Sequence, residues 1–399
     1  MSPSPAADVV DAGDPEQVAA ALGEELVRRT GRGPEVVTCA PGRVNLIGEH
    51  LDYNRGRCLP LALPHATYAA AAARGDRVLS VTSLAMAETR QVPLDGLAPG
   101  AVHGWAAYVA GVLWAMAADG RPVRGVDVVV DSRVPVGAGL SSSAALECAV
   151  ALAVLELAGV PDTPDARRAL VAACVRAETE MVGAPTGGMD QSVALLAERG
   201  HALLLDFADG TPTQVPWAPE ADGLTLLVVD TRVSHRLVDG GYASRRKQCE
   251  RAARELGVES LRDVQGHPEV LDRLADPVVR RRARHVLTEL DRVDVATDAL
   301  THGDHAALGP VLDDSHASLR DDFEVSCAEL DVAVATCRGH GALGARMTGG
   351  GFGGSAVALV PTDRVDEVGQ AVTDEFAARR WAPPGLLPAP ASGGARRIR

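Results

Sequence analysis

Residues 135–145 read Pro-Val-Gly-Ala-Gly-Leu-Ser-Ser-Ser-Ala-Ala, and they lie between two apolar segments of different pattern. The segment before them, 125–131, predicts a strand, and Ser141 to Leu157 predicts a helix. Glycines allow backbone N–H groups to approach an anion closely, and the N-terminus of a helix adds free donors and partial positive charge. A glycine turn capped by serines is the alternative, but two glycines and three serines exceed what capping needs. The segment therefore predicts a phosphate-binding strand–loop–helix unit.

The charge of the chain limits how it can hold a phosphate. The formal net charge is -14 and the pI is about 5.3, which argues against nucleic acid or an anionic membrane as the main partner. A triphosphate must then be bound by local donors such as those of residues 135–145. Because aromatic residues make up only 3% of a chain that is 46% hydrophobic, we expect a core built mainly of Ala, Val and Leu.

The 399 residues are enough for about two domains. Short strand-like runs at 36–39, 59–63, 67–73, 77–83 and 201–206 are followed, after a strand at 224–230, by helical patterns at 242–256, 278–299, 304–319 and 326–337. A further helix is expected at 163–182. We predict a mixed α+β chain whose two domains are 1–215 and 216–399. The C-terminal Pro-, Ala- and Gly-rich residues show little pattern, and we expect them to be loosely held.

The remaining composition predicts an ordinary cytoplasmic protein. The seven cysteines are scattered and form no C-x-x-C pair, which favours reduced thiols over disulfides or a zinc site. Met1 to Asp14 lacks the basic start and apolar stretch of a signal peptide, and no apolar run is long enough to span a membrane.

A second glycine-rich segment, Thr348 to Gly354, formally contains G-x-G-x-x-G. A dinucleotide-binding loop would open a helix, whereas Ser355 to Val360 has the pattern of a strand. The interpretation as a dinucleotide site therefore fails, and five glycines in six residues indicate backbone packed against a ligand or another loop. The chain also lacks the Walker A loop and the H-R-D and D-F-G motifs of protein kinases.

The third segment, Pro41 to Asn54, places six polar residues around a short apolar centre. Two interpretations stay open from the residues alone: a surface hairpin, or a cluster of donors and acceptors suited to a polyhydroxylated ligand. The six are Arg43, Asn45, Glu49, His50, Asp52 and Asn54.

Taken together, the three segments resemble the GHMP kinase superfamily and, within it, the galactokinases. GRVNLIGEHLDYN is similar to the galactokinase signature, PVGAGLSSSAA to the phosphate loop of the superfamily, and TGGGFGG to its third motif. The likeness covers nearly the whole chain. It implies a two-domain fold with the active site between the domains, and transfer of the γ-phosphoryl group of ATP to the anomeric hydroxyl of α-D-galactose, with Mg2+ as the cofactor. It also implies galactose and MgATP as the partners, and a monomer or a weak dimer.

The same resemblance implies the roles of individual residues. Asp190 would be the catalytic base, with Arg43 beside it keeping the carboxylate ionised and neutralising charge on the phosphoryl group. Since a loose transition state needs the proton removed only late, Arg43 could matter more than Asp190. The sugar would be bound by Glu49, His50, Asp52, Gly187 and Tyr242. The nucleotide would be bound by Gly137, Ala138, Gly139, Leu140, Ser141, Ser142 and Ser143, with Ser83 and Trp105 near its base, and Mg2+ by Ser143 and Glu178.

Two departures and two alternatives accompany this resemblance. Leu51 stands where the family commonly has Thr, and Asp230-Thr231-Arg232 replaces an Asn-rich strand end, which leaves the exact sugar open. The acceptor could be N-acetylgalactosamine or arabinose. The chain could also be a non-catalytic galactose sensor, but that relative lacks two residues of the Ser-Ala stretch, whereas Ser143-Ala144 is present here.

Overall fold

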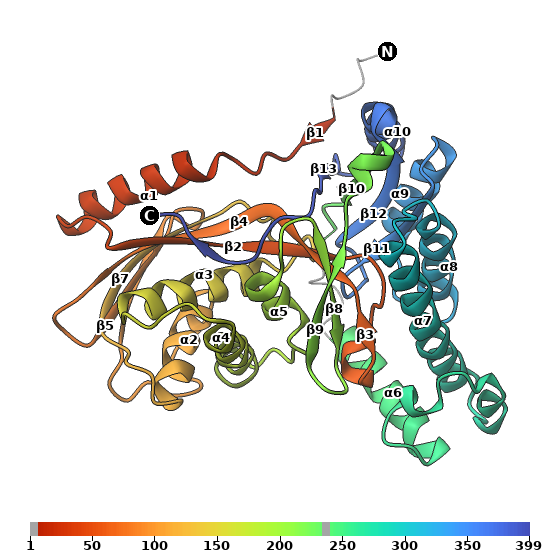
Figure 1. Cartoon of the computed structure of the whole chain (residues 1–399), viewed down its shortest axis with the longest axis horizontal. Helices are drawn as coiled ribbons and strands as arrows, with labels where there is room; N and C mark the ends of the chain where they lie inside the picture. The colour runs from red at the N-terminus through yellow and green to blue at the C-terminus, as the bar shows by residue number, and fades with distance from the viewer. Residues whose placement is uncertain (1–6, 234–239) are drawn as a thin grey trace.

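The computed structural model describes residues 7–233 and 240–399, so the first residues of the N-terminal segment considered above lie outside it. Strands and helices alternate irregularly along the chain and form a mixed α+β fold, as predicted. Figure 1 shows two halves next to each other. One is layered on a long sheet, and the other is rich in helices that lie beside a second sheet. None of the helices in the described ranges has both the length and the apolar character to cross a membrane.

The first half is built on a six-stranded sheet in the order β14-β2-β4-β7-β5-β6. Its long central strands are almost entirely buried because helices cover both of their faces, so they show little alternation in the sequence. The strands are β2 (Val36–Asn45), β4 (Pro60–Ala73), β5 (Val78–Ser83), β6 (Glu88–Pro93), β7 (Val126–Ser132) and β14 (Arg396–Arg397).

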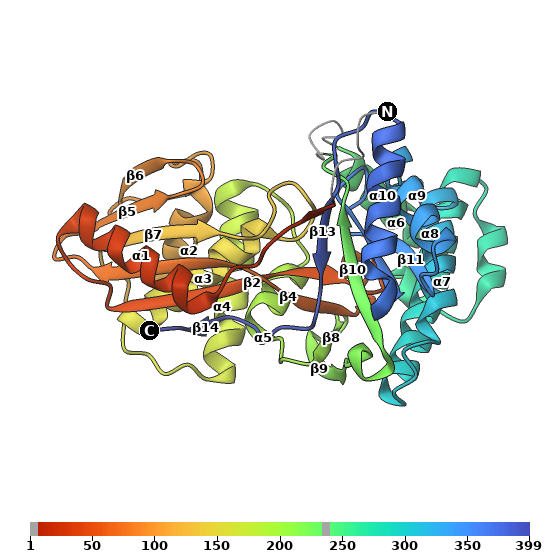
Figure 2. The same cartoon turned by 90° about the horizontal axis from the view of Figure 1, so that it is seen from above.

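One face of this sheet carries four helices and the other carries α1 (Figures 1 and 2). Helix α1 (Pro15–Thr30) begins at Asp14, whose side chain accepts a hydrogen bond from the Gln17 N–H, and it ends at Gly31 in the left-handed conformation. The four helices are α2 (Ala106–Ala118), α3 (Ser142–Leu157), α4 (Pro164–Arg176) and α5 (Met189–Leu196).

The helix expected at 163–182 is not uniform. Helix α4 gives way at Ala177 to a π-helical segment, η2 (Ala177–Val182), which ends at Gly183. Such wide turns are rare, and they often occur at functional sites because they re-aim a side chain without ending the helix. Glu178 lies on this segment.

The second half contains a five-stranded sheet in the order β1-β13-β10-β12-β11, and its helices lie beside that sheet. A small sheet, β3-β8-β9, lies between the halves. The strands are β1 (Asp8–Val9), β3 (Arg57–Cys58), β8 (His201–Asp206), β9 (Thr211–Pro216), β10 (Leu224–Asp230), β11 (Gly344–Thr348), β12 (Ser355–Pro361) and β13 (Gly385–Pro388). The helices are α6 (Gly241–Leu256), α7 (Pro277–Thr301), α8 (Leu308–Asp321), α9 (Ala328–Gly339) and α10 (Val365–Ala378).

The expected core of Ala, Val and Leu is confirmed. Alanines and valines of β4, β7 and α3 fill the first half, and leucines and valines of β10, β12 and α7 fill the second. The small side chains allow α3 to pack closely on β2 and β4.

The prediction of a loose C-terminal region is wrong. Strand β13 pairs with both β1 and β10, and β14 pairs with β2. Leu386, Leu387 and Ala395 are buried. These strands are only four and two residues long, too short for a periodic pattern, and they are held by pairing and burial instead of by propensity.

The two ends of the described chain cross between the halves. Strand β1 belongs to the sheet of the second half, and β14 belongs to the sheet of the first half. The division at 215/216 therefore stays a prediction. Strand β1, before that point, pairs in the sheet of the second half, and β14, after it, pairs in the sheet of the first half.

Candidate active site

A cavity of about 170 Å3 lies where the two halves meet. Its lining combines residues of the segments 41–54 and 348–354 with Glu178 and the N-terminal ends of α5 and α6. Residues 137–143 do not line it, and Gly139 is joined to it through its contact with Arg43. Eight of the residues predicted from the sequence line it: Arg43, Glu49, His50, Asp52, Glu178, Gly187, Asp190 and Tyr242. Polar groups separated by up to about 200 residues along the chain thus converge on one small space, which decides against the surface-hairpin interpretation of residues 41–54.

Arg43 and Asp190 form an ion pair in the cavity. Arg43 Nε and Nη2 lie 3.0 and 2.9 Å from Asp190 Oδ1, and Nη1 donates to the Gly139 carbonyl. Arg43 is nearly buried at the end of β2, whereas Asp190 is about a quarter exposed at the N-terminus of α5. The guanidinium therefore joins the carboxylate to the glycine-serine loop, in a geometry that a shorter or more flexible cation would not give.

The glycine-serine loop has the backbone that its glycines predict. Gly137 and Gly139 have φ of 80° and 71°, and Ser141 has φ of 62°, which is uncommon for a residue with a side chain. The Ser141 hydroxyl is buried and has no hydrogen-bond partner among the described residues. A buried unpaired hydroxyl before the N-terminus of α3 favours a ligand that accepts hydrogen bonds there.

Close packing positions this loop against β2. The Arg43 N–H donates to the Leu140 carbonyl at 3.1 Å, and a Cβ at Gly42 would lie 2.6 Å from that same oxygen. Only glycine fits at position 42, so the loop and Arg43 are held in a fixed relation.

A group of carboxylates lies beside the loop. Ser143 Oγ donates to Glu178 Oε1 at 3.2 Å, and Gln191 Nε2 contacts both Glu178 and the fully buried Glu147. Burial, with Asp190 nearby, raises the pKa of Glu178 to about 7, and burial with Glu178 nearby raises the pKa of Glu147 well above its ordinary value. One oxygen of Glu147 and one of Gln191 have no partner within the described chain.

Glu49 is the centre of a buried network that joins the halves. Its carboxylate accepts hydrogen bonds from Asn45 Nδ2 at 2.8 Å, Thr348 Oγ1 at 3.0 Å and the Gly349 N–H at 2.8 Å, and from the guanidinium of Arg346. A carboxylate has about four acceptor positions, so these four donors occupy them. Burial raises the pKa of Glu49, and Arg346 opposes that rise.

His50, Asp52 and Tyr242 form a less saturated side of the cavity. Tyr242 OH donates to Asp52 Oδ2 at 3.2 Å, and burial raises the pKa of both groups. His50 Nδ1 lies 2.9 Å from Tyr53 OH, while its buried Nε2 has no partner of hydrogen-bonding geometry in the described ranges. Because burial lowers the pKa of His50 to about 3, the imidazole is neutral at neutral pH. These groups retain capacity to bind a polar ligand.

Gly187 faces Asp52 so closely that a Cβ would lie 2.4 Å from Asp52 Oδ2. The glycine therefore allows the loop before α5 to reach the carboxylate. The third motif has a similar role, since Gly349 and Gly350 line the cavity while added Cβ atoms at Gly351 and Gly353 would lie within 2.6 Å of other backbone oxygens. Strand β12 follows this motif directly, which confirms that it is not a dinucleotide-binding loop.

Some predicted residues lie elsewhere. Ser83 is in β5, where its hydroxyl accepts from the Met86 N–H, and Trp105 Nε1 donates to Glu88 Oε2 at 2.7 Å. Neither lines the cavity, and their assignment to the nucleotide base stays a prediction. Leu51 is fully buried in the core and does not line the cavity.

Sequence reasoning missed the supporting residues. Arg346, Glu289, Glu147 and Gln191 were not predicted to take part, although Arg346 and Gln191 lie in segments that fit the family resemblance. The available signal was a charge inside an apolar segment: Glu147 interrupts α3, and Arg346 interrupts β11. Such a charge must find a partner, but the sequence alone does not show which one.

Comparisons with known proteins agree with this geometry. Residues 24–73 match the galactokinase galactose-binding signature, 107–198 the GHMP kinases N terminal domain and 296–378 the GHMP kinases C terminal. The chain is 49% identical to a galactokinase of Streptomyces coelicolor over 96% of this chain and 99% of that one. It is 45% identical to a galactokinase of Bos taurus over 87% and 89% of the two chains.

Solved structures give the same result. The crystal structure of Lactococcus lactis galactokinase complexed with galactose matches with a TM-score of 0.88 and 29% identity, covering 96% of this chain and all of that one. A mevalonate kinase of Methanococcus jannaschii, 15% identical, shares the fold with a TM-score of 0.66 over 92% of this chain and all of that one. The fold is thus that of the GHMP kinases, and the chain belongs to the galactokinase family.

Proposed function

We propose that this protein transfers the γ-phosphoryl group of ATP to the anomeric hydroxyl of α-D-galactose, giving galactose 1-phosphate and ADP. The observation that carries the proposal is the Arg43–Asp190 pair, which connects the polar cavity to the glycine-serine loop through the Gly139 carbonyl. A sugar hydroxyl in the cavity and a phosphate on the loop would meet at this pair. Full-length relatives named galactokinases support the same reaction.

Asp190 is the proposed base. Its carboxylate accepts from Arg43 through Oδ1, which leaves Oδ2 for the anomeric hydroxyl. As the hydroxyl oxygen bonds to the γ-phosphorus, its proton passes to Asp190 and ADP leaves with the electrons of the broken P–O bond. Arg43 stabilises the negative charge on the transferring group, and the rigid pair positions both reactants.

The nucleotide is proposed to lie on residues 137–143. The left-handed glycines, the unpaired Ser141 hydroxyl and the start of α3 form a set of donors that suits a polyphosphate in an acidic protein.

Ser143 and Glu178 fit a magnesium ion bound together with phosphate oxygens. Within the described chain no cluster of three His, Cys, Asp or Glu side chains could hold a metal alone, which suits Mg2+, because this ion usually takes one or two protein oxygens, phosphate and water. Burial and the nearby charge of Asp190 raise the pKa of Glu178, and a bound cation would offset both effects. Bound there, Mg2+ would neutralise phosphate charge during transfer.

The sugar is proposed to bind to His50, Asp52, Gly187 and Tyr242, with Glu49 behind them. Asp52 accepts from Tyr242 and has further acceptor capacity for sugar hydroxyls. The wrong epimer would leave that capacity unfilled, which gives selectivity. Glu49 is already saturated by protein donors, so we propose that it mainly fixes Gly349 and the wall of the cavity. The cytoplasmic location and the monomeric or weakly dimeric state stay predictions.

An ADP-release assay with ATP, Mg2+ and a panel of sugars tests the proposal. We expect release with galactose, and a loss of at least about 100-fold in kcat for Asp190→Ala and for Arg43→Ala. A higher kcat/KM for N-acetylgalactosamine or arabinose than for galactose would favour the related sugar kinases. Galactose binding without ADP release would favour the non-catalytic sensor, and a full rate in Asp190→Ala would exclude this residue as the base.

A further inference from the structure

The outer face of the six-stranded sheet changes character beside α1. Under the helix, residues of β2 and β4 such as Val37, Tyr68 and Ala70 form an apolar cluster with Leu22 and Leu26 of α1. Figure 2, which views this side, shows that β5 and β6 lie beside α1 and not beneath it. Helix α1 packs on β4 and β7, so β5 and β6 are the strands left without a helix on this face.

Strand alternation gives the uncovered part a polar surface. Leu79, Val81 and Val92 point to the helices of the inner face, so their neighbours in sequence point outward. Ser80 pairs with Gln91 and Thr82 pairs with Thr89 across the two strands, and the two threonine hydroxyls lie 2.9 Å apart.

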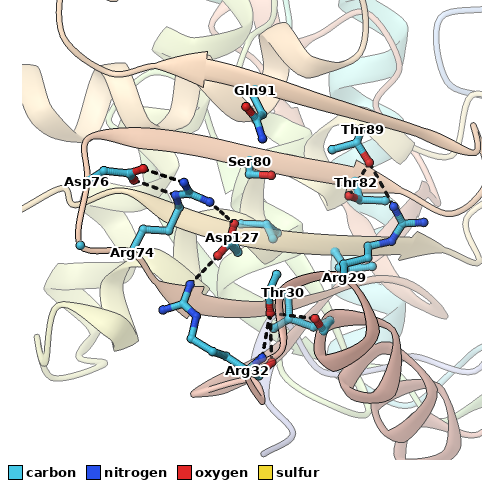
Figure 3. Close-up of a pocket in the computed structure, with 14 residues that line it drawn as sticks. Arg29, Thr30, Arg32, Arg74, Asp76, Ser80, Thr82, Thr89, Gln91 and Asp127 are labelled. Atoms are coloured by element: carbon cyan, nitrogen blue, oxygen red, sulfur yellow. Dashed lines mark hydrogen bonds and ion pairs between the residues drawn. The ribbon is translucent and has the colours of Figure 1, made fainter.

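This surface is the floor of a cavity of about 480 Å3, larger than the one between the halves. Figure 3 shows its walls: Arg29 and Arg32 come from the end of α1 and the residues after it, and Arg74 comes from the end of β4. None of the cavity's 14 lining residues lines the candidate active site, so the two cavities are separate.

Ion pairs hold two of the guanidinium groups in place. Asp127, which is only 4% exposed in β7, accepts from Arg32 Nη2 on one oxygen and from Arg74 Nη1 on the other, both at 2.6 Å. Arg74 also forms a bidentate pair with Asp76 at the rim (Figure 3). A buried carboxylate shared by two arginines fixes the positions of both, because leaving either of its oxygens unpaired would cost stability.

The arginines keep donors for a further partner. A guanidinium has five N–H donors. The hydrogen bonds described for Arg74 use three of its nitrogens, and those described for Arg32 use two. Arg29 donates from Nε to Glu25 and from Nη1 to Thr89. The three arginines of the lining outnumber its two carboxylates, Asp76 and Asp127, so the cavity carries a formal charge of +1 in a protein of net charge -14.

The chemistry of the lining selects the ligand class. Within the described chain the cavity wall includes no aromatic side chain, so a nucleobase would find no aromatic ring to stack on. Hydroxyl and amide groups on the floor suit sugar or polyol hydroxyls, and arginines on the walls suit a phosphate. We propose that this cavity is a second ligand site, which binds a small phosphorylated sugar or polyol on the outer face of the sheet.

Calorimetric titration of the whole protein tests the site. The catalytic cavity is first filled with saturating galactose and a non-hydrolysable ATP analogue with Mg2+. Galactose 1-phosphate, glycerol 3-phosphate, inorganic phosphate and further galactose are then added in separate titrations. We expect the two phosphorylated polyols to bind at one site per chain, inorganic phosphate to bind more weakly, and galactose to give no further heat. The galactose 1-phosphate titration rests on the proposed function, and the glycerol 3-phosphate titration does not.

Two single-charge variants on neighbouring residues locate the site. Gln91→Glu adds one negative charge to the floor of the cavity, and we expect it to weaken phosphate binding about tenfold. Arg90→Gln changes the net charge equally, but Arg90 points to the other face of β6, so binding should stay within about twofold. Both variants should keep the wild-type kcat, because neither residue lines the active-site cavity.

Four outcomes would overturn the proposal. Absence of saturable binding by both phosphorylated polyols would exclude the site, and equal weakening by the two variants would place any binding elsewhere. Inorganic phosphate binding as tightly as the polyol phosphates would show that the hydroxyl groups of the floor do not contribute to binding of the ligand. Binding of further galactose would show that the phosphate is not needed. The preference between galactose 1-phosphate and glycerol 3-phosphate identifies the source of the ligand.

Discussion

Two groups of buried carboxylates border the active-site cavity, and they are balanced differently. At the sugar end, Glu49 and Glu289 face Arg346 and Arg292, with Ser315 and backbone N–H groups as further donors. Although burial acts to raise it, the two arginines lower the pKa of Glu289 to about 2. The two guanidinium groups of this set balance its two carboxylates without any ligand.

At the proposed phosphate end, Arg43 pairs with Asp190 and lies near Glu178, whereas the hydrogen bond described for Glu147 comes from the neutral Gln191. Burial and mutual repulsion raise the pKa of the two glutamates. The first group therefore joins the halves without any ligand, whereas the proposed Mg2+ would complete the second.

Breaking the balanced group should have the largest effect, and it should affect stability. We expect Arg346→Met to lower the free energy of unfolding by about 3–5 kcal/mol, because two buried carboxylates lose their shared partner. Urea unfolding followed by circular dichroism measures this loss. Arg338→Met, which removes the exposed partner of Asp313, is the control and should cost less than about 1 kcal/mol. Equal midpoints for the two variants would contradict the assigned role.

Changing the unbalanced group should affect activity instead. We expect Glu178→Gln to lower kcat about 100-fold and to raise the Mg2+ concentration for half-maximal rate, since a neutral amide is a poorer ligand. Steady-state rates across a Mg2+ titration give both values. Glu180→Gln, on the same π-helical segment but exposed and paired with Arg176, should leave both unchanged. A lower rate with an unchanged Mg2+ requirement would exclude Glu178 as a metal ligand.

Asp52 and Glu49 of the proposed sugar site should differ in the same way. We expect Asp52→Asn to raise the galactose KM about 10- to 100-fold with little change in stability, because Asp52 retains free acceptor capacity. Glu49→Gln should instead lower the urea midpoint, because it removes the charge that faces Arg346. Kinetics and unfolding of both variants check this, and the reverse pattern would make Glu49 the main sugar ligand.

The smallest expected effect is a pH dependence of the metal-free protein. A carboxyl whose folded pKa is raised binds a proton that the unfolded chain has lost, so stability falls as pH rises from about 4.5 to about 7. We expect Glu178→Gln to remove about 1–2 kcal/mol of this fall between pH 5.5 and 7.5. Urea unfolding without Mg2+ at the two pH values measures it. Parallel curves for variant and wild type would show that Glu178 does not titrate in this range.

The sequence predicted the parts that depend on local pattern. The glycine-serine loop, the strand after the third motif and the polar residues of 41–54 were recognisable because each needs particular residue types in a short window. The contacts that join these parts were not recognisable. Glu49 and Arg346 are almost 300 residues apart in the sequence, and each is simply a charged residue in apolar surroundings. The π-helical turn at Glu178 and the short strands near the C-terminus also carry no periodic signal, as they are imposed by packing.

The pairing of β14 with β2 also affects how the sheet forms during synthesis, because the two strands are made far apart in time. Residues 396–397 follow β2 by roughly 350 positions along the chain. At a synthesis rate of about 5–20 residues per second, β2 is therefore made roughly 20–70 s before the strand that pairs with its edge. During that time the N-terminal sheet has one bare, largely apolar border that could pair with another nascent chain. Completion of this enzyme therefore depends on a two-residue strand made very late, and a ribosome that pauses before it leaves the border open for longer.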